Sequence, residues 1–149
     1  MFDVDALQWA TGIFEGEGSV YLTRTPKGYP TLTVVLGANT DPAIIERLSR
    51  LAGWRPLTVG AYRQRPNEKQ CWCVKVTGNV ARRFLRLIYP FITKGSSKQT
   101  QAAIAMVYPV ANQRTKDTAE QRKLRNILKD ECFKALTRIK AAPFRALAT

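Results

Sequence analysis

Two acidic residues lie among three glycines near the start of the chain, in the string Gly12-Ile13-Phe14-Glu15-Gly16-Glu17-Gly18. The apolar residues before it predict a helix over residues 3 to 14. The C-terminal end of a helix carries a partial negative charge, which repels a carboxylate by about 0.3–1 kcal/mol. Carboxylate and carbonyl oxygens are the ligands that Mg²⁺ prefers, so Glu15, Glu17 and the Gly16 carbonyl form a candidate cation site. Taken alone, the string is equally compatible with a solvated acidic turn.

The acidic string stands in a strongly basic chain. Lysine and arginine number 24 against 11 aspartates and glutamates, which gives a net charge of +13 and an isoelectric point of about 10.2. A polyanion is the natural partner of such a chain, because each neutralised phosphate releases counterions. The composition therefore favours nucleic acid, with a solvated basic surface as the alternative. A membrane-surface role is disfavoured, since no helix at an end of the chain pairs a Lys/Arg face with a continuous apolar face.

The absence of histidine restricts the chemistry further. It excludes histidine-dependent hydrolysis and every histidine-containing zinc motif. The chain has three cysteines, Cys71, Cys73 and Cys132. The first two are too closely spaced for a zinc knuckle, and a fourth ligand is lacking. We therefore expect ordinary half-buried thiols without chemical activity.

The length of 149 residues suits one domain with a real core. No apolar run reaches the roughly 18 residues that a membrane span needs. Gly12, read as the first turn-like break, comes too early for a signal peptide with an apolar centre and a cleavage site. We expect a single intracellular domain over residues 1–149, in a compartment that the sequence does not identify.

The periodicity of apolar residues predicts an αββαββα order of elements. After the first helix, strands over residues 19–25 and 29–37 lead to a helix over 42–52. Strands over 57–65 and 70–77 then lead to a helix over 80–88. The repeated ββα unit predicts an α+β fold, with one four-stranded antiparallel sheet and helices on one face. The face assignment of the second strand stays open, because Leu32, Val34 and Leu36 compete with Val35.

Two further helices follow the αββαββα core of about residues 3–108. Ser96 and Gln99 have the spacing of a capping box and open a helix that ends near Pro109. A last helix starts at Thr118, within an extension of about residues 112–149. It places Leu124, Ile127, Leu128, Ala135, Leu136 and Ile139 at helical spacing and is rich in Lys and Arg on its other face.

The first helix has two apolar sides. Leu7, Ala10, Thr11 and Phe14 form one stripe, and a second stripe consists of Ala6, Trp9 and Ile13. A helix that is apolar on two sides must be covered on two sides. The core of the domain can cover one of them, so we expect another body to cover the second.

The segment "ALQWATGIFEGEGSVYL" resembles the signature of LAGLIDADG homing endonucleases: a helix rich in small residues, an acid, Gly, a second acid, Gly and then a strand. The stretches "NTD" at 39–41 and "IYPFI…KQTQAAIA" also resemble that family, and so does the αββαββα order. The resemblance covers about residues 3–108. It implies a saddle-shaped sheet that straddles duplex DNA in the major groove, and an intron-encoded enzyme that cuts both strands at a long, specific site.

The resemblance also implies an oligomeric state. Family members with one motif are homodimers, and this chain has a single copy of the motif. The second side of the first helix would then pack on its symmetry mate, with small residues allowing close approach. The implied interface residues are Leu7, Ala10, Thr11, Gly12, Phe14 and Glu15.

Roles for individual residues follow from the same resemblance. Glu17 aligns with the metal-binding acid, where the family often has Asp, and Gly16 would offer its carbonyl. Glu15 aligns with the acid that shapes the turn. Asn39 matches a polar residue near the attacking water, and Lys98 matches the lysine of the catalytic pocket. The implied cofactor is Mg²⁺, with Mn²⁺ as a substitute and Ca²⁺ expected to bind without supporting cleavage.

Lys98 carries a physical argument of its own. It falls in the first turn of a predicted helix, where the helix dipole disfavours a cation. A phosphate is favoured at the same place, so the pairing makes sense if a scissile phosphate binds there. A solvated lysine is the alternative, and Lys94 is the second candidate for the same role.

Sequence readout is expected from the sheet face that no helix covers. Arg and Gln make bidentate contacts with base edges in the major groove, and Thr methyl groups make apolar ones. Lys27 and Lys69, at predicted turns, are expected to contact phosphates. The other expected DNA contacts are Tyr21, Thr23, Thr25, Tyr29, Thr31, Thr33, Arg63, Gln64, Arg65, Gln70 and Lys75.

Two rival functions belong to a different class. The chain could be an RNA-binding maturase that helps its host intron to splice, or a DNA-binding protein that does not cut. The acids at 15 and 17 favour the nuclease, because a pure binder has no need of carboxylates at a helix end that faces phosphate.

Overall fold

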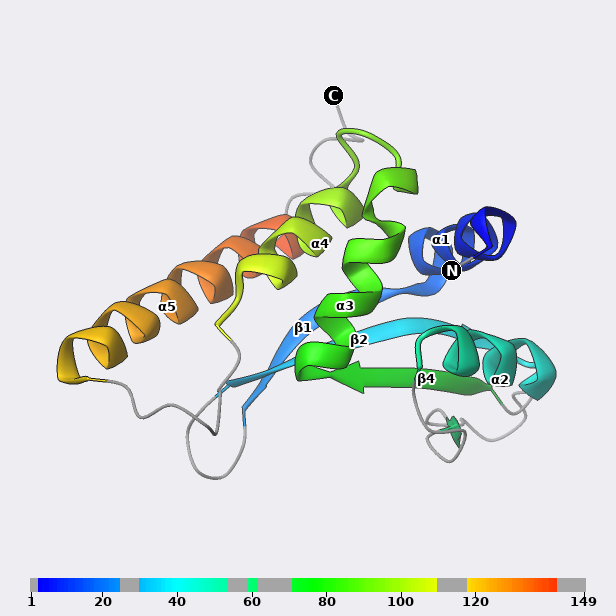
Figure 1. Ribbon diagram of the computed structural model, residues 1–149, viewed down its shortest axis with the longest axis horizontal. Coiled ribbons are helices and arrows are strands. Elements are labelled where there is room, and N and C mark those ends of the chain that lie inside the picture. Colours follow the sequence, from blue (N-terminus) through cyan, green and yellow to red (C-terminus); the bar gives the residue numbers. More distant parts are fainter. Residues whose placement is uncertain (1–2, 25–29, 54–58, 62–70, 110–117, 142–149) are drawn as a thin grey trace.

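A computed structural model describes residues 3–24, 30–53, 59–61, 71–109 and 118–141 of the chain. Helices gather on one side of an antiparallel sheet (Figure 1). The predicted α+β class and antiparallel sheet are confirmed. The elements in chain order are α1 (Val4–Glu17), β1 (Ser19–Arg24), β2 (Pro30–Asn39), α2 (Pro42–Leu51), β3 (Val59–Ala61), β4 (Trp72–Thr77), α3 (Gly78–Ile88), the short 3₁₀ helix η2 (Tyr89–Phe91), α4 (Ser97–Val107) and α5 (Ala119–Ala141).

The sheet has the strand order β1-β2-β4-β3. The longer strands β1, β2 and β4 form its body, and the three-residue β3 pairs with β4 at the edge. The strand predicted over residues 57–65 corresponds to β3, and its residues 57–58 and 62–65 lie outside the described part of the chain. Of the strand predicted over 70–77, residue 70 also lies outside it.

Cross-strand pairing settles the faces of the sheet. Val20 pairs with Val34, and Val34 pairs with Val76. All three are fully buried, so this row faces the helices. The neighbouring row of Ser19, Val35 and Lys75 must then face the opposite side, because side chains alternate along a strand.

A bulge between Val35 and Gly37 explains why the face of β2 could not be predicted. Leu36 is the extra residue and is fully buried, and Gly37 lies opposite the inward-facing Val74. A Cβ atom at Gly37 would lie 2.4 Å from Cγ2 of Ile13. Glycine therefore lets α1 approach the sheet closely at this point.

Helix α1 is longer than predicted. It runs from Val4 through Gly12 and Gly16 to Glu17, and the Asp3 carboxylate accepts a hydrogen bond from the Asp5 backbone nitrogen at 3.0 Å. Gly12 is exposed within the helix and does not interrupt it. Glycine costs a helix only about 1 kcal/mol, which the packing of the apolar stripes readily offsets.

The chain itself packs against both apolar sides of α1. The stripe of Leu7, Ala10, Thr11 and Phe14 is buried in the core. Trp9 and Ile13, of the second stripe, are partly buried against the same core. The Arg47 guanidinium of α2 also lies 4.2 Å from the Trp9 ring centroid. The chain itself therefore covers part of the second stripe, and cover of the rest by another body stays a prediction.

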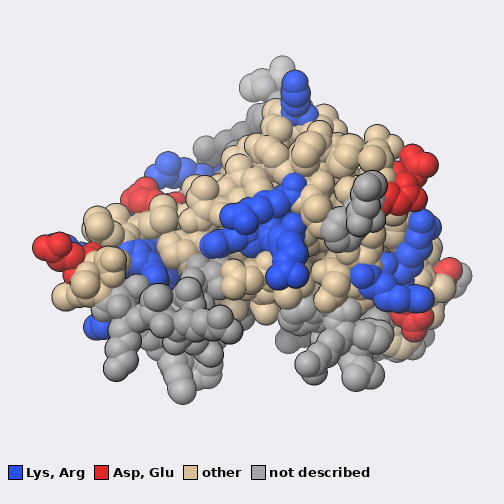
Figure 2. Space-filling model, in the orientation of Figure 1, with Lys and Arg blue, Asp and Glu red and all other residues tan. Residues whose placement is uncertain are grey.

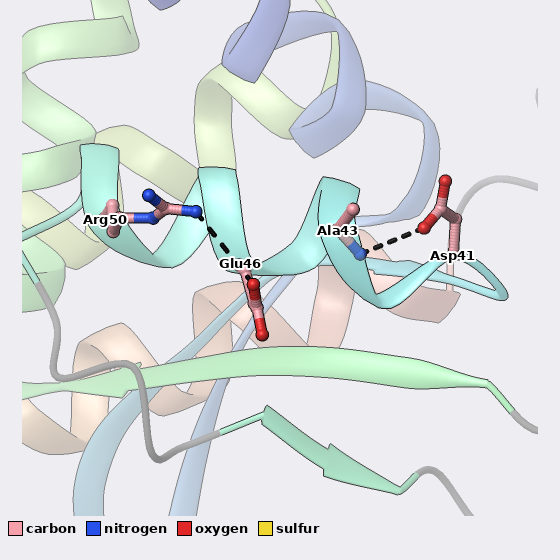
Figure 3. Close-up of polar contacts among 4 residues, drawn as sticks. All are labelled: Asp41, Ala43, Glu46 and Arg50. Carbon is pink, nitrogen blue, oxygen red and sulfur yellow. Dashed lines mark hydrogen bonds and ion pairs between the residues drawn. The ribbon is translucent and has the colours of Figure 1, made fainter.

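Helix α2 matches its prediction. Asp41 caps it by accepting a hydrogen bond from the Ala43 backbone nitrogen at 2.9 Å, as Figure 3 shows. Gly53 follows the helix with φ of +69°, a conformation that favours glycine. Glu46 and Arg50 form an exposed ion pair one turn apart, at 3.9 Å (Figure 3). Exposed pairs of this kind contribute only about 0.3–0.5 kcal/mol, so the cap and the buried face define the helix.

The two C-terminal helices begin with side-chain caps. Ser96 Oγ accepts a hydrogen bond from the Gln99 backbone nitrogen at 3.2 Å, as its capping-box spacing predicts. Before α5, Thr118 and Gln121 exchange two hydrogen bonds, at 3.0 and 3.2 Å, in a full capping box that we had not predicted. No helix in the described part of the chain is long and apolar enough to cross a membrane.

Only the second half of α5 packs on the domain. Cys132 and Leu136 are buried there, against α4 and β1. The first half extends beyond the sheet, at the left of Figure 1. Leu124, Ile127 and Leu128 are 67%, 51% and 41% exposed. The helical spacing of these three residues therefore did not predict burial.

Candidate active site

A cleft of about 450 Å³ opens beside the last residue of α1. Ser19, Val35 and Lys75 form one cross-strand row in it, so it lies on the sheet face opposite the helices. Among the described residues, the cleft is lined by Glu17, Ser19, Tyr21, Val35, Ala38, Cys71 and Lys75. We call it the Glu17 cleft.

Gly18 determines how Glu17 reaches this cleft. The backbone leaves the helix at Gly18, which is extended and donates to the Phe14 carbonyl oxygen at 2.8 Å. A Cβ atom at Gly18 would lie 2.3 Å from Cδ2 of Phe14. Glycine therefore lets the chain pass over Phe14 and enter β1. As a result, the exposed Glu17 stands where the helix ends and the sheet begins.

Glu15 points to a different environment. Its carboxylate accepts hydrogen bonds from the Thr93 backbone nitrogen at 2.6 Å and from the Thr93 hydroxyl at 3.1 Å. These contacts tie the last turn of α1 to the segment between η2 and α4. Glu15 is not among the residues that line the Glu17 cleft, so Glu17 is the one carboxylate that the described residues place there.

Two residues of α4 hold the backbone that follows Glu17. The Lys98 ammonium donates a hydrogen bond to the Gly18 carbonyl oxygen. One turn later, the buried Gln101 accepts one from the Val20 backbone nitrogen at 3.2 Å. Lys98 thus lies at the negative end of α1, where a cation is favoured. The position of Lys98 in the first turn of α4 gives no indication of this contact with the end of α1.

Neither Lys98 nor Asn39 lines the Glu17 cleft. Asn39 is the last residue of β2 and follows Ala38, which does line it. The Asn39 side-chain oxygen accepts a hydrogen bond from the Asp41 backbone nitrogen at 2.9 Å, in a local turn before α2. Lys94, the second candidate lysine, is exposed in the loop before α4. The structure therefore brings Lys98 to the backbone next to Glu17, but it places neither Asn39 nor Lys94 in the lining of the Glu17 cleft.

The predicted DNA-contacting residues fall partly on the face of this cleft. Tyr21 and Lys75 line it, and Thr33 pairs with Tyr21 on the same sheet face but is itself buried. Thr31 pairs with Thr23, of which only the backbone is described. The remaining predicted contacts, Thr25, Lys27, Tyr29, Arg63, Gln64, Arg65, Lys69 and Gln70, lie outside the described residues.

Four lining residues were missed by the sequence analysis: Ser19, Val35, Ala38 and Cys71. The alternation of β1 and β4 pointed to Ser19 and Cys71, because they share a face with Tyr21 and Lys75. Val35 and Ala38 lie on either side of the β2 bulge. To place these two residues in the lining of the cleft, one needs the register of the sheet, which the sequence did not reveal.

Most of the predicted dimer-interface residues belong to the core of the single chain. Leu7, Ala10, Thr11 and Phe14 are buried within it, so their side chains are unavailable to a second copy. One exposed stripe of α1 is formed by Gln8, Gly12 and Gly16, which we call the Gly12 face. A cleft of about 200 Å³, lined by Gln8, Thr11, Gly12, Glu15, Phe91 and Thr93, lies beside it.

The thiols differ in exposure. All three cysteines are free, and burial raises the pKa of the Cys73 and Cys132 thiols. Both therefore stay protonated and unreactive at neutral pH. Cys71 is half-buried and lines the Glu17 cleft.

Within the described ranges, no cluster of three or more His, Cys, Asp or Glu could hold a metal ion.

Basic side chains also gather far from the Glu17 cleft. In Figure 2 the central group of Lys and Arg lies where Figure 1 places α3. Helix α3 carries Arg82, Arg83 and Arg86 and no acidic residue. Arg82 donates to the Tyr108 carbonyl oxygen, and burial lowers the pKa of its guanidinium.

Comparison with known proteins supports the fold. No family model matches the chain, and no curated protein matches it. One similar crystal structure is the homing endonuclease I-CvuI in complex with the I-CreI target in the presence of magnesium, with the DNA not cleaved. It is 14% identical, covers 87% of this chain and 80% of that chain, and has a TM-score of 0.57.

A second similar structure is I-CvuI in complex with its own target in the presence of calcium. It is 13% identical, covers 91% of this chain and 90% of that chain, and has a TM-score of 0.56. At such low identity the similarity establishes the fold alone. The relationship to homing endonucleases is therefore one of architecture, and the roles of individual residues must be argued from this chain.

Proposed function

We propose that the protein is a metal-dependent DNA endonuclease that cuts both strands of a long, specific site as a homodimer. One observation carries the proposal: an exposed carboxylate, Glu17, borders a cleft on the sheet face opposite the helices, in a fold similar to that of DNA-bound homing endonucleases. A carboxylate beside a DNA-binding surface repels phosphate unless a cation lies between them. A hydrolytic site explains its presence.

The residues at the end of α1 fit a divalent cation in part. The Glu17 carboxylate and the Gly16 carbonyl are hard oxygen donors of the kind that Mg²⁺ prefers. One chain supplies too few such donors, since Glu15 is bonded to Thr93. Mg²⁺ keeps several waters and often binds substrate phosphates, so DNA oxygens and Glu17 of a second copy would complete the set. When bound, the metal would stabilise negative charge on the phosphodiester.

The surface around the cleft suits DNA. A net charge of +13 favours a polyanion, and Tyr21 and Lys75 line the cleft on the sheet face opposite the helices. In the proposed complex this face forms a saddle on the duplex and reads the major groove. We leave Asn39 and Lys98 out of the lining of the proposed reaction site, because their polar atoms bond to backbone groups: Asn39 to the Asp41 nitrogen, and Lys98 to the Gly18 carbonyl oxygen next to Glu17.

The Gly12 face supports the proposed dimer. Neither Gly12 nor Gly16 has a heavy atom within 4 Å of where a Cβ would stand. Two α1 helices can therefore approach closely along this face, since glycine adds no side chain between the backbones. Such packing would bring two copies of Glu17 near one axis, one for each DNA strand.

A nucleic-acid-binding protein that does not cut is the second candidate. The arginine group on α3 favours it, because these residues lie on the helical layer and away from the Glu17 cleft. Arginine clusters of this kind suit the phosphates of a folded RNA. An intron maturase on the same fold would use such a surface and would need no carboxylate at position 17.

The test is cleavage of a randomised duplex library by the purified protein, in Mg²⁺ and in EDTA, with the new DNA ends sequenced. The proposal expects metal-dependent double-strand breaks that converge on one family of sites. The same library is used for binding without metal. Binding without breaks in either Mg²⁺ or Mn²⁺ would identify a binder and remove the nuclease assignment.

A further inference from the structure

Lys75 faces the same cleft as Glu17, although the two residues belong to different elements. Lys75 lies on β4, opposite Val35 of β2, and Val35 lies opposite Ser19 of β1. Ser19 is two residues after Glu17. Two strand spacings place the Lys75 and Ser19 backbones about 10 Å apart. Both side chains, that of Lys75 and that of Glu17, are exposed and line the cleft.

The two charged groups are not bonded to each other. No ion pair or hydrogen bond joins Glu17 to Lys75 in the structure, although both residues are described. The cleft between them measures about 450 Å³, against roughly 30 Å³ for one water molecule. A carboxylate and an ammonium that face one open space are complementary to a ligand with both charges. A divalent cation bound to a phosphate is such a ligand.

The other lysines near Glu17 are less suitable for this role. The Lys98 ammonium donates to the Gly18 carbonyl oxygen and lies 5.8 Å from the Phe14 ring centroid. It would have to leave the end of α1, where its charge is favoured, to reach a phosphate in the cleft. Lys94 is exposed but does not line the cleft.

We propose that Lys75 contacts the scissile phosphate in the Glu17 cleft, and that Lys98 is a positioning residue that holds the backbone after Glu17. The inference rests on the proposed endonuclease function. In hydrolysis, a water oxygen bonds to phosphorus, the bond to the leaving oxygen breaks, and the leaving oxygen takes a proton from solvent while the water loses one to solvent. Negative charge grows on the phosphate oxygens, and Lys75 offsets it.

The first experiment measures binding to a random-sequence duplex without metal, over a series of salt concentrations. Lys75→Met removes the charge and keeps the length of the side chain. Loss of one phosphate contact should lower the salt slope by about one per subunit. Lys123→Met is the matched control, because Lys123 is an exposed lysine of α5 that lines a different surface. An unchanged slope for Lys75→Met would overturn the proposal.

The second experiment uses the duplex selected from the library and follows single-turnover cleavage. Lys75→Met should slow cleavage by about 10²-fold, the usual effect of losing one charge-stabilising group, and Lys75→Arg should recover most of the rate. Lys98→Met should instead lower the melting temperature. Wild-type cleavage rates in Lys75→Met would overturn the proposal.

The two experiments separate this inference from the proposed function. If the wild-type protein cuts no duplex, the endonuclease assignment fails, while the salt slope still reports whether Lys75 contacts phosphate. If the wild type cuts and Lys75→Met behaves as Lys123→Met in either experiment, only the role of Lys75 is wrong.

Discussion

The carboxylate of Glu15 accepts two hydrogen bonds from Thr93, from its backbone nitrogen at 2.6 Å and from its hydroxyl at 3.1 Å. Glu17, only two residues later, is exposed at the Glu17 cleft. Residues two apart on a helix point in different directions. The two acids therefore have different roles. Glu15 fastens α1 to the loop before α4, and Glu17 is open to a ligand.

The Glu15 contact should matter for stability. Glu15→Gln keeps the size of the side chain but weakens both hydrogen bonds to Thr93, which we expect to cost about 0.5–1.5 kcal/mol of unfolding free energy. For a chain of this length the melting temperature should fall by roughly 2–4 °C per kcal/mol. Thr93→Val should cause a similar loss, and the double variant should lose less than the sum of the two. Strict additivity would show that the two side chains do not act together.

Glu17→Gln should have the opposite profile. The amide is nearly isosteric but lacks the negative charge that a hard divalent cation requires. Metal-dependent cleavage should be abolished, whereas the melting temperature should stay within about 1 °C, because exposed substitutions change stability little. DNA binding without metal should hold or tighten, since a carboxylate is removed from beside phosphate. Cleavage near the wild-type rate in Mg²⁺ would show that Glu17 is not the metal ligand.

Gly12→Leu should weaken self-association without unfolding the chain. Gly12 is exposed on α1, and nothing lies within 4 Å of where its Cβ would stand. Leucine is the better helix former by about 0.8–1.0 kcal/mol, so the single chain should become slightly more stable. Sedimentation should nevertheless show a larger dissociation constant, because the side chain keeps two helices apart. Unchanged association would place the dimer interface on another surface.

Two glycines only two residues apart should respond in opposite ways to alanine. Gly16→Ala adds a methyl group in open space within α1 and should stabilise the fold by up to about 1 kcal/mol. Gly18→Ala places a Cβ 2.3 Å from Phe14 Cδ2 and 2.6 Å from the Phe14 carbonyl oxygen. Such overpacking usually costs about 1–3 kcal/mol. Urea unfolding of both variants measures the difference, and equal stability of the two would refute the packing at Gly18.

Because two thiols are buried, we expect the unfolding free energy of the protein to fall at alkaline pH. Burial raises the pKa of Cys73 and Cys132 above the ordinary value of 9.0, and it raises the pKa of Tyr108 to about 12. Above pH 9 the unfolded chain releases these protons while the folded chain keeps them, so folding becomes less favourable as pH rises. Unfolding free energy should be constant near pH 7 and should fall from pH 8.5 to 10. Cys132→Ala should make that decline less steep.

Local signals in the sequence were reliable guides to the helix boundaries. Asp41 caps α2 and Ser96 caps α4 as predicted, since each cap joins residues only two or three positions apart. The cover of Trp9 on α1 includes a contact from another helix, because Arg47 of α2 lies over its ring. No periodicity within α1 indicates that contact, so the sequence alone could not show how much of the second stripe the chain itself covers.

The composition of the candidate site was only partly predictable. Glu17 stood out because an acid at a helix end is unfavourable by itself. Lys75 was expected on the open face of the sheet, but its place beside Glu17 follows from the register of three strands, one of which contains a bulge. The Lys98 contact with Gly18 joins residues eighty positions apart, and nothing local to either residue indicates it.

Hydrogen bonds from α4 to the backbone after Glu17 couple the position of that helix to the proposed reaction site. Lys98 and Gln101 hold the peptide groups of Gly18 and Val20, and α4 also packs against α5. A change that tilts α4, even one made at the distant α5, must therefore shift Glu17 or break one of these two bonds. The Val20 amide is then a natural reporter: its hydrogen-exchange rate measures how firmly α4 is seated, without any need to know the DNA target.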